Sequence, residues 1–150
     1  MILGALVSFL HFLAAFGVII TVVLERIFLK RQLSKREADR IRKIDGIYGL
    51  NAMLVLAFGF LRVFYFEKGS EYYFANPIFH LKLTLFIIIG LLSIYPTVRF
   101  MKWKKQFTEK DSILLDEKLF VNIKRILNIE LGLLVLLLLS ASLMAKGVFY

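Results

Sequence analysis

Apolar residues gather in four long blocks along the chain, and short polar segments separate them. The blocks cover Ile2–Leu24, Ile47–Phe66, Ile78–Val98 and Ile126–Ala145. A helix of about 20 apolar residues is long enough to cross the roughly 30 Å hydrocarbon core of a bilayer. The blocks are continuously apolar rather than alternating in period two, which argues against membrane-spanning strands. The pattern predicts an all-α membrane protein, a bundle of four transmembrane helices.

Composition agrees with this assignment. Of 150 residues, 59% are hydrophobic, whereas water-soluble domains are about 45–50% apolar. We expect a single domain over residues 1–150, with helices at about 2–27, 35–66, 77–101 and 111–146. The first block has no basic segment before it and no small-residue cleavage site after it, so we interpret it as a retained span.

Local signals place several helix ends. Ser34-Lys35-Arg36-Glu37 is a capping-box pattern that predicts a helix start near Lys35. Thr108-Glu109-Lys110-Asp111 predicts a similar start for the fourth helix. Asn76-Pro77 is typical of an N-cap followed by proline at the first helical position. Pro96 is expected to kink the third helix near its inner end.

Basic residues are concentrated in the first and third loops. The net charge is +9, and the second loop, Glu67–Asn76, holds only one lysine. By the positive-inside rule, the first and third loops are cytoplasmic and both termini lie outside. The basic loops suit orientation and attraction to the lipid bilayer; no motif supports nucleic-acid binding. The basic residues of the two loops are Lys30, Arg31, Lys35, Arg36, Arg40, Arg42 and Lys43, and Lys102, Lys104, Lys105, Lys110 and Lys118.

Ionisable residues at membrane depth are costly and are therefore functional candidates. Toward the outer side these are His11, Arg62, His80 and Lys82. His11 shares a stripe with small residues of the first helix, so it should point into the bundle. His80 and Lys82 are two positions apart, about 200° around a helix, so they cannot both face one site.

A second group of polar residues lies toward the inner side. We expect structural roles in helix packing for five of its members: Glu25, Arg26, Asn51, Asn128 and Glu130. Glu130 points away from the helix face of Arg125 unless it pairs with a residue of another helix, and Glu25 or Arg26 is either that partner or a competitor for it. The sixth member, Arg125, shares a helix face with Asn128.

An imidazole inside a helical bundle, close to cations, suits a non-covalently bound haem b. His11 would ligate the iron, while Arg62 or Lys82 at the membrane edge would pair with the propionates. The sequence has no cysteine, which excludes thiolate metal sites and covalent haem attachment. Two histidines without an HExxH pattern fall short of a catalytic zinc site, and a copper site requires more grouped Met or His.

Short motifs carry a resemblance to known proteins. His80-Leu81-Lys82-Leu83 resembles the H-x-K-L opening of the third helix in HemJ-type protoporphyrinogen oxidases. His11 resembles the histidine in that family's first helix. Arg125-Ile-Leu-Asn128-Ile-Glu130 is similar to its R-x-x-N-E stretch with one residue inserted, and Lys146-Gly-Val-Phe149 resembles its terminal K-P-F.

The chain resembles more closely a family of small four-helix membrane proteins of unknown function, which is in turn distantly similar to HemJ-type and CopD-like membrane proteins. The segments that carry this resemblance are Asp45–Gly49, Gly59–Gly69, Asn76–Lys82 and Ser93–Thr97.

The HemJ-type resemblance implies a haem b protein with His11 as an axial ligand, assisted by Lys82 or Arg125. It also implies oxidation of protoporphyrinogen, or electron transfer, with a quinone or another respiratory-chain component as acceptor, in the bacterial inner membrane. Two alternatives stay open. One is a non-enzymatic membrane protein that acts as a partner or assembly factor. The other is a small transporter or metal-handling protein that works as a homo-oligomer.

Overall fold

The structure, a computed structural model, describes residues 2–107 and 111–147 and consists mainly of four long helices. They are α1 (Ile2–Phe28), α2 (Lys35–Leu61), α4 (Pro77–Gln106) and α5 (Glu117–Ala145). A π-helical segment, Arg62–Phe66, continues α2, and a short helix α3 (Ser70–Ala75) follows it. All four long helices have the length and hydropathy to cross a membrane, as the sequence pattern predicts.

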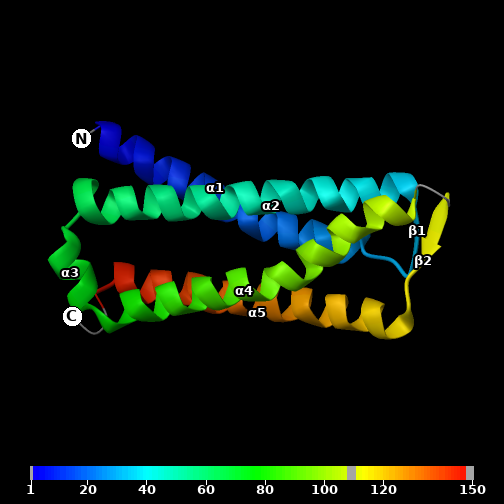
Figure 1. Ribbon diagram of the computed structural model, residues 1–150. Coiled ribbons are helices and arrows are strands. Elements are labelled where there is room, and N and C mark those ends of the chain that lie inside the picture. Colours follow the sequence, from blue (N-terminus) through cyan, green and yellow to red (C-terminus); the bar gives the residue numbers. More distant parts are fainter. Residues whose placement is uncertain (1, 108–110, 148–150) are drawn as a thin grey trace.

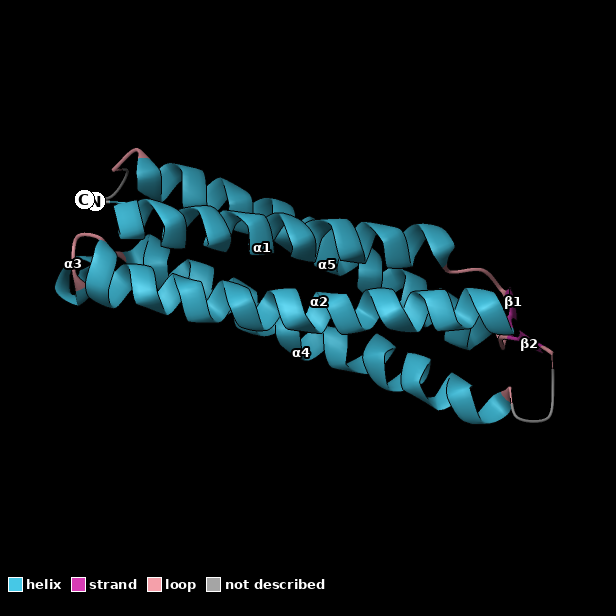
Figure 2. Ribbon diagram, turned by 90° about the horizontal axis from the view of Figure 1, so that it is seen from above, coloured by secondary structure: helices cyan, strands magenta, loops and turns pink. Residues whose placement is uncertain are grey.

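The helices form two antiparallel pairs, α1 with α2 and α4 with α5, that run along the same axis (Figures 1 and 2). Helix α1 begins, and α5 ends, at the end of the bundle where α3 lies. We call this the outer end, following the predicted orientation, and the opposite end, which carries the basic loops, the inner end. Contacts within each pair are more extensive than contacts between the pairs.

The caps predicted at Ser34 and Asn76 are present. The Ser34 hydroxyl accepts a hydrogen bond from the Glu37 amide, and the Glu37 side chain accepts one from the Ser34 amide, which completes a capping box at α2. The Asn76 side chain accepts from the Ile78 amide at 2.9 Å, with Pro77 at the first position of α4. Helix α4 continues through the buried Pro96 and changes direction in its inner half (Figure 1).

The inner end contains a small antiparallel ladder that the sequence pattern does not predict. Strand β1 (Gln32–Ser34) pairs with β2 (Ser112–Leu114), with Leu33 opposite Ile113. Helix α5 consequently begins at Glu117, capped by Asp116, rather than near residue 111. The predicted cap at Thr108–Lys110 lies outside the described residues. Helix α4 extends beyond the predicted 101 to Gln106.

Most of the fully buried apolar side chains lie in the inner half. They form a single cluster that includes Val22, Leu33, Ile41, Phe100, Trp103, Ile123 and Leu127. A smaller cluster of Val63, Ile78, Phe79 and Met144 lies toward the outer end. Many large apolar side chains face outward on all four long helices, as expected of a surface solvated by lipid tails; examples are Phe9, Phe16, Ile20, Leu50, Met53, Leu91, Ile94, Val135 and Leu139.

Candidate functional site

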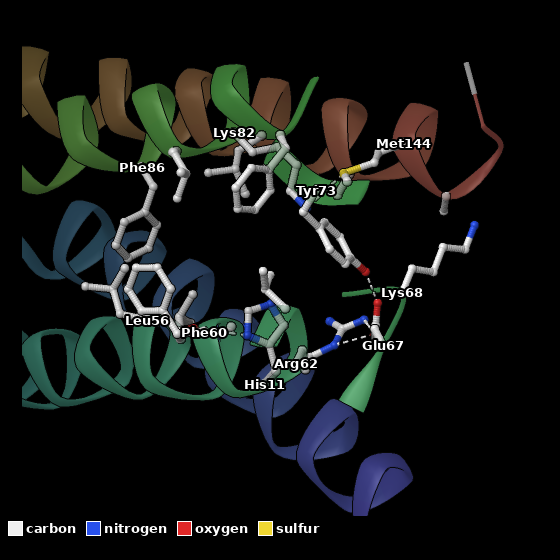
Figure 3. A pocket seen from close by; sticks show the side chains of 18 of the residues that line it. His11, Leu56, Phe60, Arg62, Glu67, Lys68, Tyr73, Lys82, Phe86 and Met144 are labelled. Atoms are coloured by element: carbon white, nitrogen blue, oxygen red, sulfur yellow. Dashed lines mark hydrogen bonds and ion pairs between the residues drawn. The ribbon is translucent and has the colours of Figure 1, made fainter. Parts of the chain in front are cut away.

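A cavity of about 370 Å³ lies in the outer half, between the two helix pairs (Figure 3). This volume falls within the roughly 300–1,000 Å³ of small-molecule and cofactor sites. Most of its wall is apolar, with polar side chains gathered toward the outer end. Its lining includes Val55, Leu56, Phe60, Phe79, Leu83, Phe86 and Leu137, together with His11, Arg62, Glu67, Lys68, Tyr72, Tyr73, Lys82 and Met144.

His11 crosses from α1 to α2 and lies against the cavity. Its Nδ1 lies 3.1 Å from the carbonyl oxygen of Val55 and, because a carbonyl can only accept, Nδ1 carries the proton. The other ring nitrogen, Nε2, then has a lone pair and faces the cavity in Figure 3. A hydrogen bond that fixes one nitrogen while the other stays accessible is the arrangement usual for metal-ligating histidines.

Gly59 on α2 gives the His11 ring its room. A Cβ atom at position 59 would lie 3.3 Å from His11 Cε1 and 3.6 Å from Nδ1. The ring would have to move by a few tenths of an ångström to accept it. The absence of a side chain at Gly59 therefore lets imidazole and helix approach closely enough for the hydrogen bond to Val55.

Arg62, Glu67 and Tyr73 form a polar network at the outer rim of the cavity. Arg62 Nε donates to Glu67 Oε1 at 2.7 Å, Arg62 Nη2 donates to the same oxygen, and the Tyr73 hydroxyl donates to Glu67 Oε2. The π-helical turn between Arg62 and Glu67 produces this pairing, since five residues span one turn there. The Arg62 guanidinium also lies over the Phe12 ring, 5.0 Å from its centroid.

Two members of this network lie outside the membrane-spanning helices and have shifted pKa values. Burial alone would raise the pKa of Glu67, but the hydrogen bonds from Tyr73 and Arg62 and the charge of Arg62 hold it below its ordinary value. Burial, and then the hydrogen bond to the Glu67 carboxylate, raise the pKa of the Tyr73 hydroxyl. Glu67 is therefore ionised and neutralises Arg62.

Lys82 supplies a positive charge that no carboxylate of the described residues neutralises directly. It takes part in none of the ion pairs found within residues 2–107 and 111–147. Its Nζ lies 3.9 Å from the Met144 sulfur, a weak acceptor. The side chain lines the cavity and is only partly exposed. Because Arg62 is paired with Glu67, Lys82 gives the cavity an excess of positive charge at its outer end.

His80 and Arg125, the other two candidates, lie outside the cavity. His80 is exposed, and its Nε2 lies 2.8 Å from the Phe74 carbonyl oxygen, so it ties α4 to the end of α3. Lys82, two positions further on, faces the cavity, which matches the expected separation of their directions. Arg125 is exposed near the inner end of α5. The structure thus brings together His11, Arg62 and Lys82.

The polar residues of the inner half do not form the pairs that the sequence suggests. Arg26 Nε donates to Asn128 Oδ1 at 2.7 Å and so links α1 to α5. Glu130 is buried but forms no ion pair within the described part of the chain, with Arg26 or with any other residue. Asn51 donates to the Ile47 carbonyl at 2.9 Å and fills the space beside Gly17.

Sequence reasoning missed Glu67, Tyr73 and Met144 as parts of the site. In a regular α-helix, residues five apart do not share a face, so spacing does not connect Arg62 with Glu67. A single methionine near a helix end gives no signal of its own. The segment 62–73 is rich in aromatic residues and has Glu67 between Arg62 and Lys68, and this is the sequence feature that could have indicated the network.

The match to a known family is nearly complete in length. The family described as "Predicted membrane protein (DUF2214)" matches residues 3–149. The chain belongs to this family. No curated protein and no solved structure matches it significantly. The family description agrees with the four membrane-spanning helices and gives no activity. Membership therefore establishes a multi-pass membrane protein of the DUF2214 family, and the role of the outer cavity has to be argued from its residues.

Proposed function

We propose that the outer cavity binds haem b, with His11 as an axial ligand of the iron, and that the protein takes part in redox chemistry on porphyrins or in electron transfer. The observation that carries the proposal is the state of His11. Its Nδ1 donates to the Val55 carbonyl, and Nε2 faces the cavity with its lone pair available.

The residues around His11 suit the rest of the group. The apolar side chains of Leu56, Phe60 and Phe86 offer walls for a flat macrocycle. Lys82 and Arg62, near the outer end, are placed to pair with carboxylates such as propionates. Haem carries an apolar ring and acidic groups at one edge, and the cavity has the complementary arrangement of apolar depth and basic rim.

Bound haem would supply one-electron redox chemistry whose potential depends on its axial ligands and surroundings. The protein's own contribution is to orient the imidazole through Val55, to hold Arg62 through Glu67, and to keep Lys82 available as a cation. A distant relation to HemJ-type oxidases would place this chemistry on porphyrinogens in the bacterial inner membrane, with a quinone or another respiratory component as electron acceptor.

The test is an absorption spectrum of the protein purified in mild detergent, first oxidised and then reduced with dithionite. We expect a Soret band and sharpened bands on reduction. The chain has two histidines, and His80 offers a matched control because it is exposed and lies outside the cavity. His11→Ala should lose the spectrum, whereas His80→Ala should keep it.

A spectrum that stays blank after haem is added to the folded wild-type protein would exclude the haem proposal. Equal retention of the spectrum in both variants would exclude His11 as the ligand. Circular dichroism and size-exclusion chromatography of each variant show whether the fold persists, so loss of haem is not confused with unfolding.

A further inference from the structure

Three acidic side chains are buried in the inner half of the bundle, away from the outer cavity. Glu25 on α1 is 2% exposed, Asp45 on α2 is 9% exposed and Glu130 on α5 is 1% exposed. They come from three helices, and their carboxyl groups are close enough to interact electrostatically. Acidic residues inside membrane spans are rare and commonly mark ion or proton pathways.

The three acids have no basic partner within the described residues. All four ion pairs found there involve other carboxylates. Arg26, the nearest cation in sequence to Glu25, donates to Asn128 instead. In addition, Oε1 of Glu25 and Oε1 of Glu130 are fully buried and have no hydrogen-bond partner among the described residues. Burying an ionised carboxylate without compensation costs several kcal/mol, so another species must neutralise these groups.

Asp45 lines a second cavity, of about 530 Å³. It lies between α2 and α4, and Asp45, Tyr48, Ser93 and Thr97 are among its lining residues, together with Arg42 and Met101 toward the inner end. Asp45 Oδ1 accepts a hydrogen bond from the Thr97 hydroxyl at 2.6 Å. Arg42, the basic residue of this lining, is paired with Asp39 at 2.7 Å. The acid at this cavity is therefore not neutralised by its neighbours.

We propose that Glu25, Asp45 and Glu130 form a proton-binding site that exchanges protons with the inner side through this second cavity. The groups that face Glu25 are Asp45 and Tyr48 from α2 and Glu130 from α5, and the hydroxyl of Thr97 reaches Asp45 from α4. All of these are acidic or neutral. The species that neutralises a buried carboxylate is therefore a proton. It forms an O–H bond with a carboxylate oxygen and removes the negative charge of that group.

A proton fits these residues better than a metal ion. No group of three or more His, Cys, Asp or Glu side chains in the described chain has an arrangement that could hold a metal. This site is separate from His11 and Lys82, so the inference does not rest on haem binding in the outer cavity.

Infrared spectroscopy of the whole protein in lipid nanodiscs tests the proposal. The wild-type protein, labelled with 13C at glutamate side-chain carboxyls, should show the C=O stretch of protonated glutamate at neutral pH. Glu25→Gln and Glu130→Gln should each lose part of this band. Glu117→Gln is the matched control on α5, because Glu117 is exposed, and it should leave the band unchanged.

Exchange is tested by transfer into D2O, where the protonated band should shift, and Asp45→Asn should slow that shift. The labelled wild-type protein needs no substitution, so the result holds even if a glutamine variant fails to fold. Absence of a labelled protonated band would overturn the proposal. So would a band unaffected by both glutamine variants, or a band that never shifts in D2O. Stabilisation by sodium ions with no protonated band would also overturn it and assign a metal cation to the site.

Discussion

Gly17 on α1 lies directly against Asn51 of α2, and this close contact between the two helices makes a sharp prediction. A Cβ atom at Gly17 would lie 2.5 Å from Cγ and Oδ1 and 2.7 Å from Nδ2 of Asn51. Real Cβ atoms do not approach other atoms this closely, so in Gly17→Ala the Asn51 side chain must move. Moving it breaks the 2.9 Å hydrogen bond from Asn51 Nδ2 to the Ile47 carbonyl.

The size of the effect follows from three contributions. Alanine in place of glycine inside a helix gains about 0.5–1 kcal/mol. Displacing the end of the flexible Asn51 side chain costs at most about 1 kcal/mol, the low end of overpacking, and the lost hydrogen bond costs about 1 kcal/mol more. Gly132→Ala is the matched control, because a Cβ atom at Gly132 would meet nothing within 4 Å. We therefore expect Gly17→Ala to be less stable than Gly132→Ala by about 1–2 kcal/mol.

Thermal unfolding of both variants in the same detergent measures this difference. For a chain of this size, 1 kcal/mol corresponds to about 2–4 °C in Tm, so the two variants should differ in Tm by about 2–8 °C. Asn51→Ala combined with Gly17→Ala should recover part of the loss, because the obstructing amide is gone. A Gly17→Ala protein that gains stability as Gly132→Ala does would refute the described contact between α1 and α2.

Three further predictions concern single side chains. Glu67→Gln should lower Tm at neutral pH and flatten the decline of Tm below about pH 4.5. The pKa of Glu67 is depressed in the folded protein, so the stabilisation by its carboxylate is lost as the pH falls through that pKa. Unfolding curves over a pH series that overlay those of the wild type would contradict this prediction. Lys82→Gln should weaken haem binding, measured by haem titration, by about 10- to 150-fold, which corresponds to the loss of one hydrogen bond to a charged group. The control Lys68→Gln should have a smaller effect, because Lys68 is exposed. Asp116→Ala should lower the free energy of unfolding by about 1 kcal/mol, because the Asp116 carboxylate caps α5 by accepting hydrogen bonds from the Lys118 and Leu119 amides. Asp116→Asn keeps a capping side chain, so its Tm should stay close to that of the wild type.

The four long helices could be predicted from the sequence, because crossing a bilayer requires a long, continuous apolar block in each helix. The N-terminal caps of α2 and α4 could also be predicted, because a cap depends on residues that are neighbours in the sequence, here Ser34 with Glu37 and Asn76 with Pro77. The β1–β2 ladder could not be predicted from the sequence. Three-residue strands carry no period, and their partners are about 80 residues apart in the chain.

The candidate site was predictable only in part, for a similar reason. The depth of His11, Arg62 and Lys82 follows from position along the spans, and helical geometry separates His80 from Lys82. The pairing of Arg62 with Glu67 depends on a π-helical turn, and no pattern of residues in the sequence predicts that turn. Within the described residues, Oε1 of Glu25 and Oε1 of Glu130 are buried without a hydrogen-bond partner, and this depends on how α1 and α5 are rotated against each other, which residue spacing along the chain does not determine.

The measurement that tests the central claim most directly is chemical rescue at His11. His11→Gly, His80→Gly and wild-type protein are reconstituted in nanodiscs, titrated with haem, and followed by absorption before and after imidazole is added. We predict that the wild type and His80→Gly bind haem, that His11→Gly does not, and that imidazole restores its Soret band by filling the space beside Gly59. Haem binding by His11→Gly that is independent of imidazole, or no binding by the wild type, would contradict the assignment of the outer cavity as a haem site.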